Sequence, residues 1–295
     1  MKIAIVCHDA GGAEQISSWL IENNQLFSYL FVIQGPALKI FNKKGISGRN
    51  VSLYDAIKIS DLVLCGTSWQ SDLEINAIIL SNKLKKKVIS FIDHWVNYRE
   101  RFIKDDNIFL PDEIWVSDQF AYERAKLIFH DIPIILQDNY YLMYEKKKYS
   151  NVSISYKESI ISNSKNVLYI GEPIAAHANK KLFRNELGYD EYTAFDYFME
   201  NRHKIASSLE KIIIRPHPSQ KTSDYEWVYN KFTNNSIIIS NETELVKDLI
   251  NVDYVVGCES MAMVIALYLG KEVYSSIPPQ GRKCVLPQSD IKFFY

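Results

Sequence analysis

A short run of β-branched residues that ends between two prolines constrains the fold of this chain more than any other stretch. Residues 212–214 are consecutive isoleucines, a run typical of a buried parallel strand. Pro216 and Pro218 lack the backbone N–H that would continue a ladder of hydrogen bonds, so the strand must end there. His217 is therefore expected at the carboxyl end of a strand, which is where open α/β sheets bind ligands.

A second strand of the same kind is predicted some forty residues later, over residues 253–256. It is followed by Gly257, by Ser260 and by an apolar segment of helical length over residues 261–269. Ser260 would then lie at the N-terminus of a helix, where free backbone N–H groups and the helix dipole favour a phosphate.

These two stretches carry a resemblance to a known family. The sequence Arg215-Pro216-His217-Pro218, with Glu259-Ser260 downstream, resembles the carboxyl-terminal nucleotide domain of GT-B-fold glycosyltransferases. It is similar to the HP motif and the serine motif of bacterial sialyltransferases and capsule Kdo transferases. The resemblance implies an α/β fold of two Rossmann-like domains facing a cleft. In the resemblance, His217 and Ser260 contact the phosphate of a CMP-activated sugar. The predicted donor-binding residues are Arg215, His217, Glu259, Ser260 and Met261. The alternative is that His217 and Ser260 merely cap a strand and a helix.

The amino-terminal half begins with the same kind of pattern. Residues 3–7 predict a parallel strand, and a turn containing Gly11 and Gly12 opens a helix over residues 14–22. This is the strand, glycine turn and helix of a Rossmann-like domain, although it is not the GxGxxG of dinucleotide sites. In GT-B enzymes this loop faces the cleft, and His8 and Asp9 stand where an acceptor-handling residue would be. The alternatives are a plain tight turn and, for Asp9, a helix N-cap.

Two further strands of this half end in polar and aromatic residues. One covers residues 61–65 and is followed by Gly66, Thr67, Ser68 and Trp69; the other covers residues 88–92 and is followed by Asp93, His94 and Trp95. Sugars are often held by polar hydrogen bonds and an aromatic ring face. We therefore predict catalytic candidates and acceptor-binding candidates at these tips and in the glycine turn after residues 3–7. The catalytic candidates are Asp9, Asp93 and His94. The acceptor-binding candidates are His8, Gly11, Gly12, Ser68, Trp69 and Trp95. The tryptophans could instead pack at the rim, and Asp93 could orient His94.

Two domains are predicted, over residues 1–145 and 160–295, the first for the acceptor and the second for the donor. Between residues 139 and 165 the pattern becomes rich in Tyr, Lys and Ser, which predicts a solvated linker. Helices are expected over residues 120–129 with Asp118 as cap, over 193–209 with Thr193 as cap, and after a capping box at 241–244. A polar loop carrying Lys180, Lys181 and Arg184 is expected over residues 179–192. Residues 280–295 do not predict the closing helix that is usual in GT-B chains.

Composition excludes several classes of function. The 34 basic and 35 acidic residues give a net charge of -1, so no overall field attracts nucleic acid. The four cysteines are widely spaced and show no zinc pattern, and no DxD pair follows a strand, so we predict no metal. No secretory signal and no run of eighteen apolar residues is present, which favours a cytoplasmic protein, with peripheral association at the inner face of the membrane left open.

The leading hypothesis is a metal-independent enzyme that moves a nucleotide-activated sugar onto a bacterial surface glycan. By resemblance the sugar is a CMP-linked ulosonic acid, of the sialic acid or Kdo type. The nucleotide-sugar is a co-substrate, no other cofactor is expected, and the acceptor is a glycan or lipid-linked glycan. For the base we favour Asp9 over Asp93. The alternatives are a nucleotide-sugar epimerase or hydrolase of the same fold, and a non-catalytic subunit that binds a nucleotide or glycan.

Overall fold

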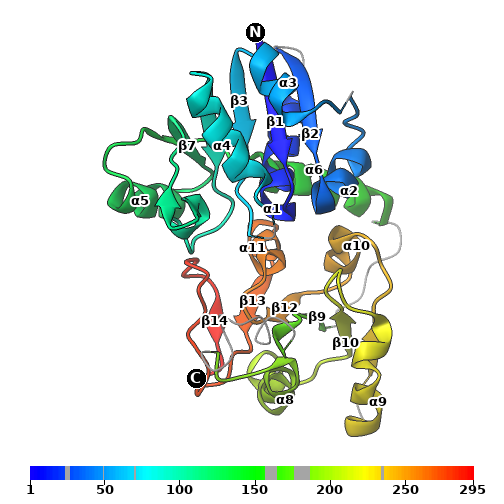
Figure 1. Cartoon of the computed structure of the whole chain (residues 1–295). Helices are drawn as coiled ribbons and strands as arrows, with labels where there is room; N and C mark the ends of the chain where they lie inside the picture. Colours follow the sequence, from blue (N-terminus) through cyan, green and yellow to red (C-terminus); the bar gives the residue numbers. More distant parts are fainter. Residues whose placement is uncertain (24–26, 49, 70, 157–164, 176–186, 234–235) are drawn as a thin grey trace. The chain divides into compact units, whose positions relative to one another are not determined.

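A computed structural model describes the chain except for residues 24–26, 49, 70, 157–164, 176–186 and 234–235. Contacts divide the chain into two compact units, Met1–Tyr144 and Glu145–Tyr295, called unit 1 and unit 2 below. Each unit is built on a parallel sheet with helices packed against it (Figure 1). The predicted α/β fold of two Rossmann-like domains is confirmed at the level of the units themselves.

Unit 1 has a sheet of strand order β2-β1-β3-β4-β7-β8, in which all pairs are parallel. Its first elements are β1 (Lys2–Cys7), α1 (Ala10–Asn23), β2 (Ser28–Ile33), α2 (Gly35–Lys43), α3 (Leu53–Ile59), β3 (Leu62–Cys65), α4 (Leu73–Lys83) and β4 (Lys87–Phe91). They are followed by η1 (Glu100–Phe102), the short antiparallel pair β5 (Ile103–Lys104) and β6 (Asn107–Ile108), β7 (Glu113–Val116), α5 (Gln119–Ile128) and β8 (Ile134–Leu136).

Unit 2 has a sheet of strand order β11-β10-β9-β12-β13-β14, again parallel throughout. Its first elements are β9 (Asn166–Ile170), α8 (Glu191–Asn201), η2 (Arg202–Lys204), β10 (Lys211–Arg215), η3 (Thr222–Tyr225) and α9 (Trp227–Lys231). The last are β11 (Ile237–Ile239), α10 (Leu245–Ile250), β12 (Tyr254–Gly257), α11 (Met261–Tyr268), β13 (Glu272–Ser275) and β14 (Lys292–Phe293).

The isoleucine run forms β10 because both faces of a parallel sheet are buried. Ile212 and Ile214 point to one face and join a core with Phe195 and Phe198 of α8. Successive side chains of a strand alternate between faces, so Ile213 lies on the other side. As predicted, β10 ends before Pro216, and β12 is followed by α11 with Ser260 at its N-terminus.

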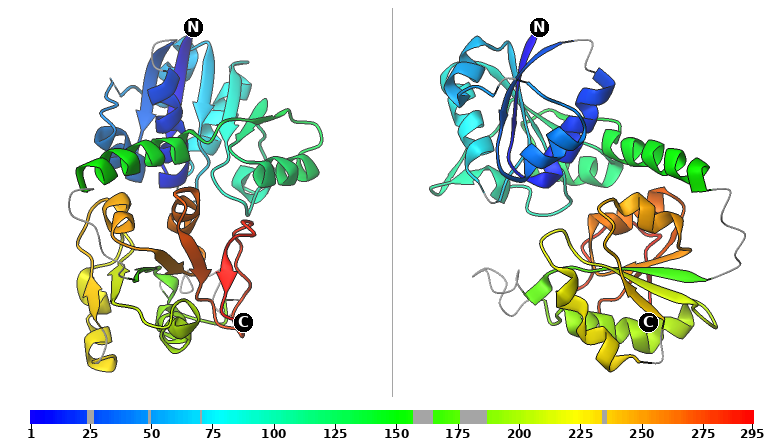
Figure 2. Two further views of the ribbon diagram at one scale, coloured as in Figure 1. Left: turned by 180° about the vertical axis from the view of Figure 1, so that it is seen from behind. Right: turned by 90° about the vertical axis from the view of Figure 1, so that its right-hand side faces the viewer.

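The predicted linker is wrong over most of its length, because residues Tyr140–Tyr156 form one helix, α6 (Figure 2). The helix has no apolar stripe that a sequence pattern would detect. In unit 1, Lys44 lies over the rings of Tyr141 and Tyr144 and pairs with Glu14. Two tyrosine rings thus pack against a cation at the start of this helix, a contact that leaves no hydrophobic periodicity in the sequence.

Two predicted caps are also wrong. The N-cap of α8 is Asp190, whose carboxylate accepts the Thr193 N–H at 2.8 Å, and Thr193 completes the capping box from inside the helix. The helix ends at Asn201, well before residue 209. At α10 the N-cap is Glu244, which makes no side-chain capping bond, so the capping box at 241–244 does not form. Asp118 does cap α5, through the Ala121 N–H at 2.8 Å.

Residues 280–295 contain no helix, as predicted, and end in β14, which extends the sheet beside β13. Phe294 is buried and stacks on Tyr274. Lys180, Lys181 and Arg184 lie outside the described residues.

Candidate functional site

Each sheet has a point where the chain reverses the direction in which it adds strands. In unit 1 this point lies between β1 and β3, and in unit 2 it lies between β9 and β12. Open α/β sheets bind ligands in the crevice outside the carboxyl ends of such strands. The strand order therefore directs attention to two groups of residues: those that follow β1 and β3, and those that follow β9 and β12.

In unit 1 a carboxylate bridges the two strands at this point. Asp9, after β1, accepts the backbone N–H of Trp69, after β3, at 2.8 Å through Oδ2. Its other oxygen lies 2.7 Å from Nδ1 of His8. Burial opposes ionisation of Asp9, but the hydrogen bonds from the Trp69 N–H and from His8 lower its pKa below the usual value. The Asp9 carboxylate thus accepts a hydrogen bond from Nδ1–H of His8, which leaves Nε2 of the imidazole as the basic nitrogen.

The backbone around His8 is held from two further sides. Glu74 of α4 is buried and accepts the His8 N–H at 2.6 Å. Burial raises the pKa of Glu74 to about 7. Gly35 adopts a φ of +53°, and a Cβ there would lie 2.5 Å from Nε2 of His8. A glycine is therefore required at the start of α2 both for its conformation and for the space that the imidazole occupies.

Asp93, after β4, is committed to an ion pair. Its Oδ1 lies 2.8 Å from a guanidinium nitrogen of Arg101, whose side chain is 4% exposed. The same guanidinium donates to the hydroxyl of Thr67 at 2.5 Å. Gly11 makes room for this arrangement, because a Cβ there would lie 1.7 Å from Oδ2 of Asp93. Asp93 thus forms an ion pair with a buried cation and packs closely against the glycine turn after β1.

The other predicted residues of unit 1 differ in their exposure and in their partners. Trp69 is half exposed, and the Arg101 guanidinium lies 5.7 Å from its ring centre, so it offers an aromatic surface at the strand ends. Trp95 is buried and donates its indole N–H to Asp118, which agrees with the rim-packing alternative. His94 is partly buried, its pKa is lowered by burial, and its Nδ1 accepts the Trp95 N–H.

Gly12 lies against Gly66, and a Cβ on Gly12 would come within 3.0 Å of the Gly66 backbone. Ser68 directly precedes Trp69 in this turn.

In unit 2 the residue at the reversal point is Glu172, for which the sequence suggested no role. It follows β9, and its Oε1 accepts the N–H groups of Cys258 and Glu259 at 2.9 and 3.0 Å. Burial raises the pKa of Glu172 to about 7, although the hydrogen bonds from those N–H groups oppose the rise. An acidic residue placed directly after a buried strand and before a proline was the signal that could have identified it.

His217 lies at the end of β10, as predicted, and its ring is oriented by the turn that follows. Nδ1 accepts the Ser219 N–H at 3.2 Å and lies 2.7 Å from the Ser219 hydroxyl. Gln220 accepts the His217 N–H at 3.2 Å and also the hydroxyl of Tyr225. Because Nδ1 is an acceptor, the proton of the neutral imidazole is on Nε2.

The remaining donor-binding candidates have structural partners. Arg215 lies 2.5 Å from Asp248 and donates to the Glu242 carbonyl, which ties β10 to the start of α10. Glu259 pairs with Arg282 of the carboxyl-terminal tail.

Ser260 and Met261 begin α11. Ser260 lies at the helix N-terminus, as predicted, and its hydroxyl accepts the Ala262 N–H at 3.2 Å, which is the capping role of the alternative interpretation. Met261 is its first residue, close to the turn that Glu172 holds.

Two features are absent from the part of the chain that the structure describes. Within them, no group of three or more His, Cys, Asp or Glu side chains is arranged to hold a metal ion. No helix formed by the described residues has both the length and the apolar character that a membrane crossing requires.

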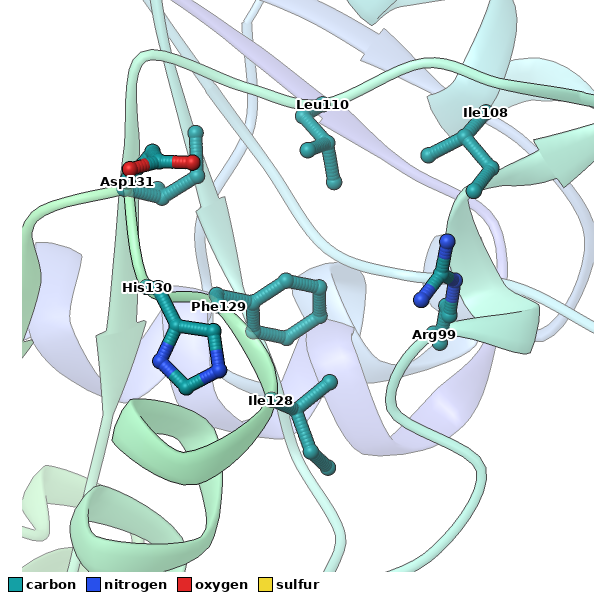
Figure 3. Close-up of a pocket in the computed structure, with 8 residues that line it drawn as sticks. Arg99, Ile108, Leu110, Ile128, Phe129, His130 and Asp131 are labelled. Atoms are coloured by element: carbon teal, nitrogen blue, oxygen red, sulfur yellow. The ribbon is translucent and has the colours of Figure 1, made fainter.

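Unit 1 also has a cavity of about 150 Å³ that shares no lining residue with the sites above (Figure 3). Phe129 lies between Arg99 on one side and His130 and Asp131 on the other. The walls of the cavity are otherwise aliphatic and are formed by Ile108, Leu110, Ile128 and Ile132.

No family model and no curated protein matches the sequence. Several solved structures share the fold. The UDP-GlcNAc 2-epimerase from Neisseria meningitidis bound to UDP-GlcNAc has a TM-score of 0.64 at 14% identity, over 93% of this chain and 82% of that one. Anabaena Alr3699/HepE in complex with UDP and glucose gives 0.55 at 11% identity, over 93% and 80%. MurG of Acinetobacter baumannii gives 0.52 at 9% identity, over 94% and 79%. The chain thus has the two-unit Rossmann-like fold of the GT-B type.

Proposed function

We propose that this protein is a nucleotide-sugar enzyme that transfers a sugar to an acceptor hydroxyl. The observation that carries the proposal is the His8–Asp9 pair at the reversal point of unit 1, an imidazole oriented by an ionised carboxylate. A protein that only binds nucleotide or glycan has no need of such a pair. Support for the nucleotide-sugar comes from the fold, since solved proteins that share it were crystallised with UDP-GlcNAc or with UDP and glucose.

The transfer breaks the glycosidic C–O bond of the donor and leaves its electron pair on a phosphate oxygen. In the proposal, Nε2–H of His217 and the N-terminus of α11 stabilise the charge that develops on the phosphate. The acceptor oxygen forms the new C–O bond and gives its proton to Nε2 of His8. Asp9 stabilises the imidazolium that results, because it already holds Nδ1–H.

Trp69 is proposed as the surface on which an acceptor sugar rests. Its ring is half exposed, and its backbone N–H is tied to Asp9, so a sugar stacked there would lie beside the His8–Asp9 pair. Arg215, Glu259 and Asp93 take supporting roles in the proposal, because each is engaged in an ion pair of its own unit.

Two donors should be tested first. A CMP-activated ulosonic acid follows from the Arg-Pro-His-Pro and Glu-Ser motifs, and UDP-GlcNAc follows from the ligand of the solved epimerase. Binding of CMP, CDP, UDP and GDP is measured by saturation-transfer NMR, and donors are then incubated with and without candidate glycan acceptors.

The products separate the alternatives. Nucleotide release that depends on an acceptor supports transfer. Nucleotide release without an acceptor indicates a hydrolase, and an isomerised donor with no nucleotide released indicates an epimerase. Binding without any reaction indicates a non-catalytic subunit, and binding of only adenine or nicotinamide nucleotides would overturn the proposal.

His217→Ala is expected to weaken nucleotide binding while leaving the melting temperature almost unchanged. The side chain stands at a partly exposed strand end, and loss of a hydrogen bond to a charged group costs about 1.5–3 kcal/mol, roughly a 10- to 100-fold change in Kd. Isothermal titration calorimetry checks this. The matched control is His203→Ala, which removes an exposed histidine of the same unit whose Nδ1 lies 3.1 Å from the carbonyl oxygen of Glu200. Equal affinity in both variants would remove His217 from the phosphate site.

A further inference from the structure

The N–H groups that make the β12–α11 turn attractive to a phosphate are already in use. Glu172 accepts two of them, from Cys258 and Glu259. Since β9 lies between β10 and β12 in the sheet, Glu172 also stands between the strand end that carries His217 and the turn that carries Ser260. Strands two positions apart are separated by roughly 10 Å, so a phosphate held by both would lie beside this carboxylate.

A phosphate and a carboxylate at one turn repel each other, and both need donors. We propose that donor binding at this edge is coupled to uptake of one proton by Glu172, which turns the carboxylate from a competitor of the phosphate into a neutral hydrogen-bond donor. The inference rests on the proposed nucleotide site. It adds a role for a residue that the transfer chemistry itself does not use.

Among the described residues, the groups that face Glu172 leave it as the one that titrates near neutral pH. They are Cys258, Glu259, Tyr189, Tyr225, Tyr169 and Cys284. Burial raises the pKa values of the phenols and of the Cys258 thiol, and it raises that of Cys284 to about 11, so all of them stay neutral at pH 7. Glu259 is paired with Arg282.

The direction of the pH effect follows from the charge. Burial has already raised the pKa of Glu172 to about 7, and a bound phosphate beside it would raise that pKa further. Well below pH 7 the carboxyl group is already protonated in the free protein, and binding takes up no proton. Above pH 7 each binding event must add one, so affinity falls as pH rises, by up to about tenfold per pH unit.

Proton uptake is measured by titrating CMP and UDP into the protein at pH 7.5–8 in Tris and in HEPES, whose ionisation enthalpies differ. The wild type is expected to take up close to one proton more than Glu172→Gln, and the affinity of Glu172→Gln is expected to lose the decline above pH 7. Titration of the ligand itself is the same in both proteins and cancels. The matched control is Glu191→Gln, which changes a carboxylate that accepts a backbone N–H elsewhere in unit 2, from Ala175, and should keep the uptake.

The outcomes separate this inference from the proposed function. If neither nucleotide binds the wild type, the nucleotide site fails. If nucleotide binds with equal proton uptake in the wild type and Glu172→Gln, the coupling alone is wrong. Should Glu172→Gln prove unstable, the wild type decides by itself, because an affinity that does not fall between pH 7 and 8.5 overturns the coupling.

Discussion

His8→Asn is expected to lower turnover by about 100- to 10,000-fold, which is the usual contribution of a general base. The asparagine amide can still donate to Asp9, but it has no nitrogen lone pair to replace Nε2. Donor affinity should stay within a few-fold, since His8 belongs to unit 1 and the proposed phosphate contacts belong to unit 2. The measurement is kcat with saturating donor and acceptor, together with Kd for the nucleotide.

Asp9→Asn tests whether the pair works as one unit. Its effect should be large as well, and the double variant should cost little more than the worse single variant, because residues that act together are not additive. Asp93→Asn is the matched control, since it removes the same charge from a neighbouring strand tip. If Asp93→Asn abolishes turnover and the His8 and Asp9 variants do not, the base is at the end of β4. If none of the three matters, the protein is a binding module.

The second large effect is expected on stability. Arg101→Met should lower the free energy of unfolding of unit 1 by about 3–5 kcal/mol, because it leaves the partly buried carboxylate of Asp93 without its cation. The Thr67 hydroxyl loses the hydrogen bond from Arg101 at the same time and keeps only its longer one to Asp93, at 3.3 Å. Urea denaturation followed by tryptophan fluorescence measures the loss, since Trp19, Trp69, Trp95 and Trp115 all lie in unit 1.

Two comparisons make this result interpretable. Lys87→Met removes an ion pair with Glu113 whose lysine is 56% exposed, and it should cost less than about 1 kcal/mol. Replacing both Arg101 and Asp93 by apolar residues should recover much of the loss, because no buried charge is then left unpaired. A loss as small as that of Lys87→Met would mean that solvent reaches the Arg101–Asp93 pair.

The sequence by itself determined the kind of fold and the ends of many strands. Apolar runs bounded by glycine and proline predict parallel strands from local properties alone, because a proline removes an N–H wherever it stands. The end of β10 at Arg215 and the place of Ser260 at the start of α11 followed in this way. The same local logic placed Asp9 and Asp93 at strand ends before any tertiary contact was known.

Local patterns failed where stability comes from contacts distant in the sequence. The helix α6 was missed because its tyrosines are held by a lysine of unit 1, and no apolar repeat records such packing. The assignment of charged residues failed for the same reason. Arg215 could not be distinguished from a phosphate ligand until Asp248 was found beside it, and Glu172 gave no hint of partners 86 and 87 residues away.

Strand order was decided only by the tertiary structure. The order β10-β9-β12 brings Glu172 between His217 and Ser260, and the order β2-β1-β3 brings Trp69 to Asp9. A strand's own residues specify that it is buried on both faces, but not which strand lies beside it, because every parallel strand here offers the same backbone ladder. The identity of each neighbour depends on how the connecting helices pack, and it is this choice that turned separate strand ends into candidate sites.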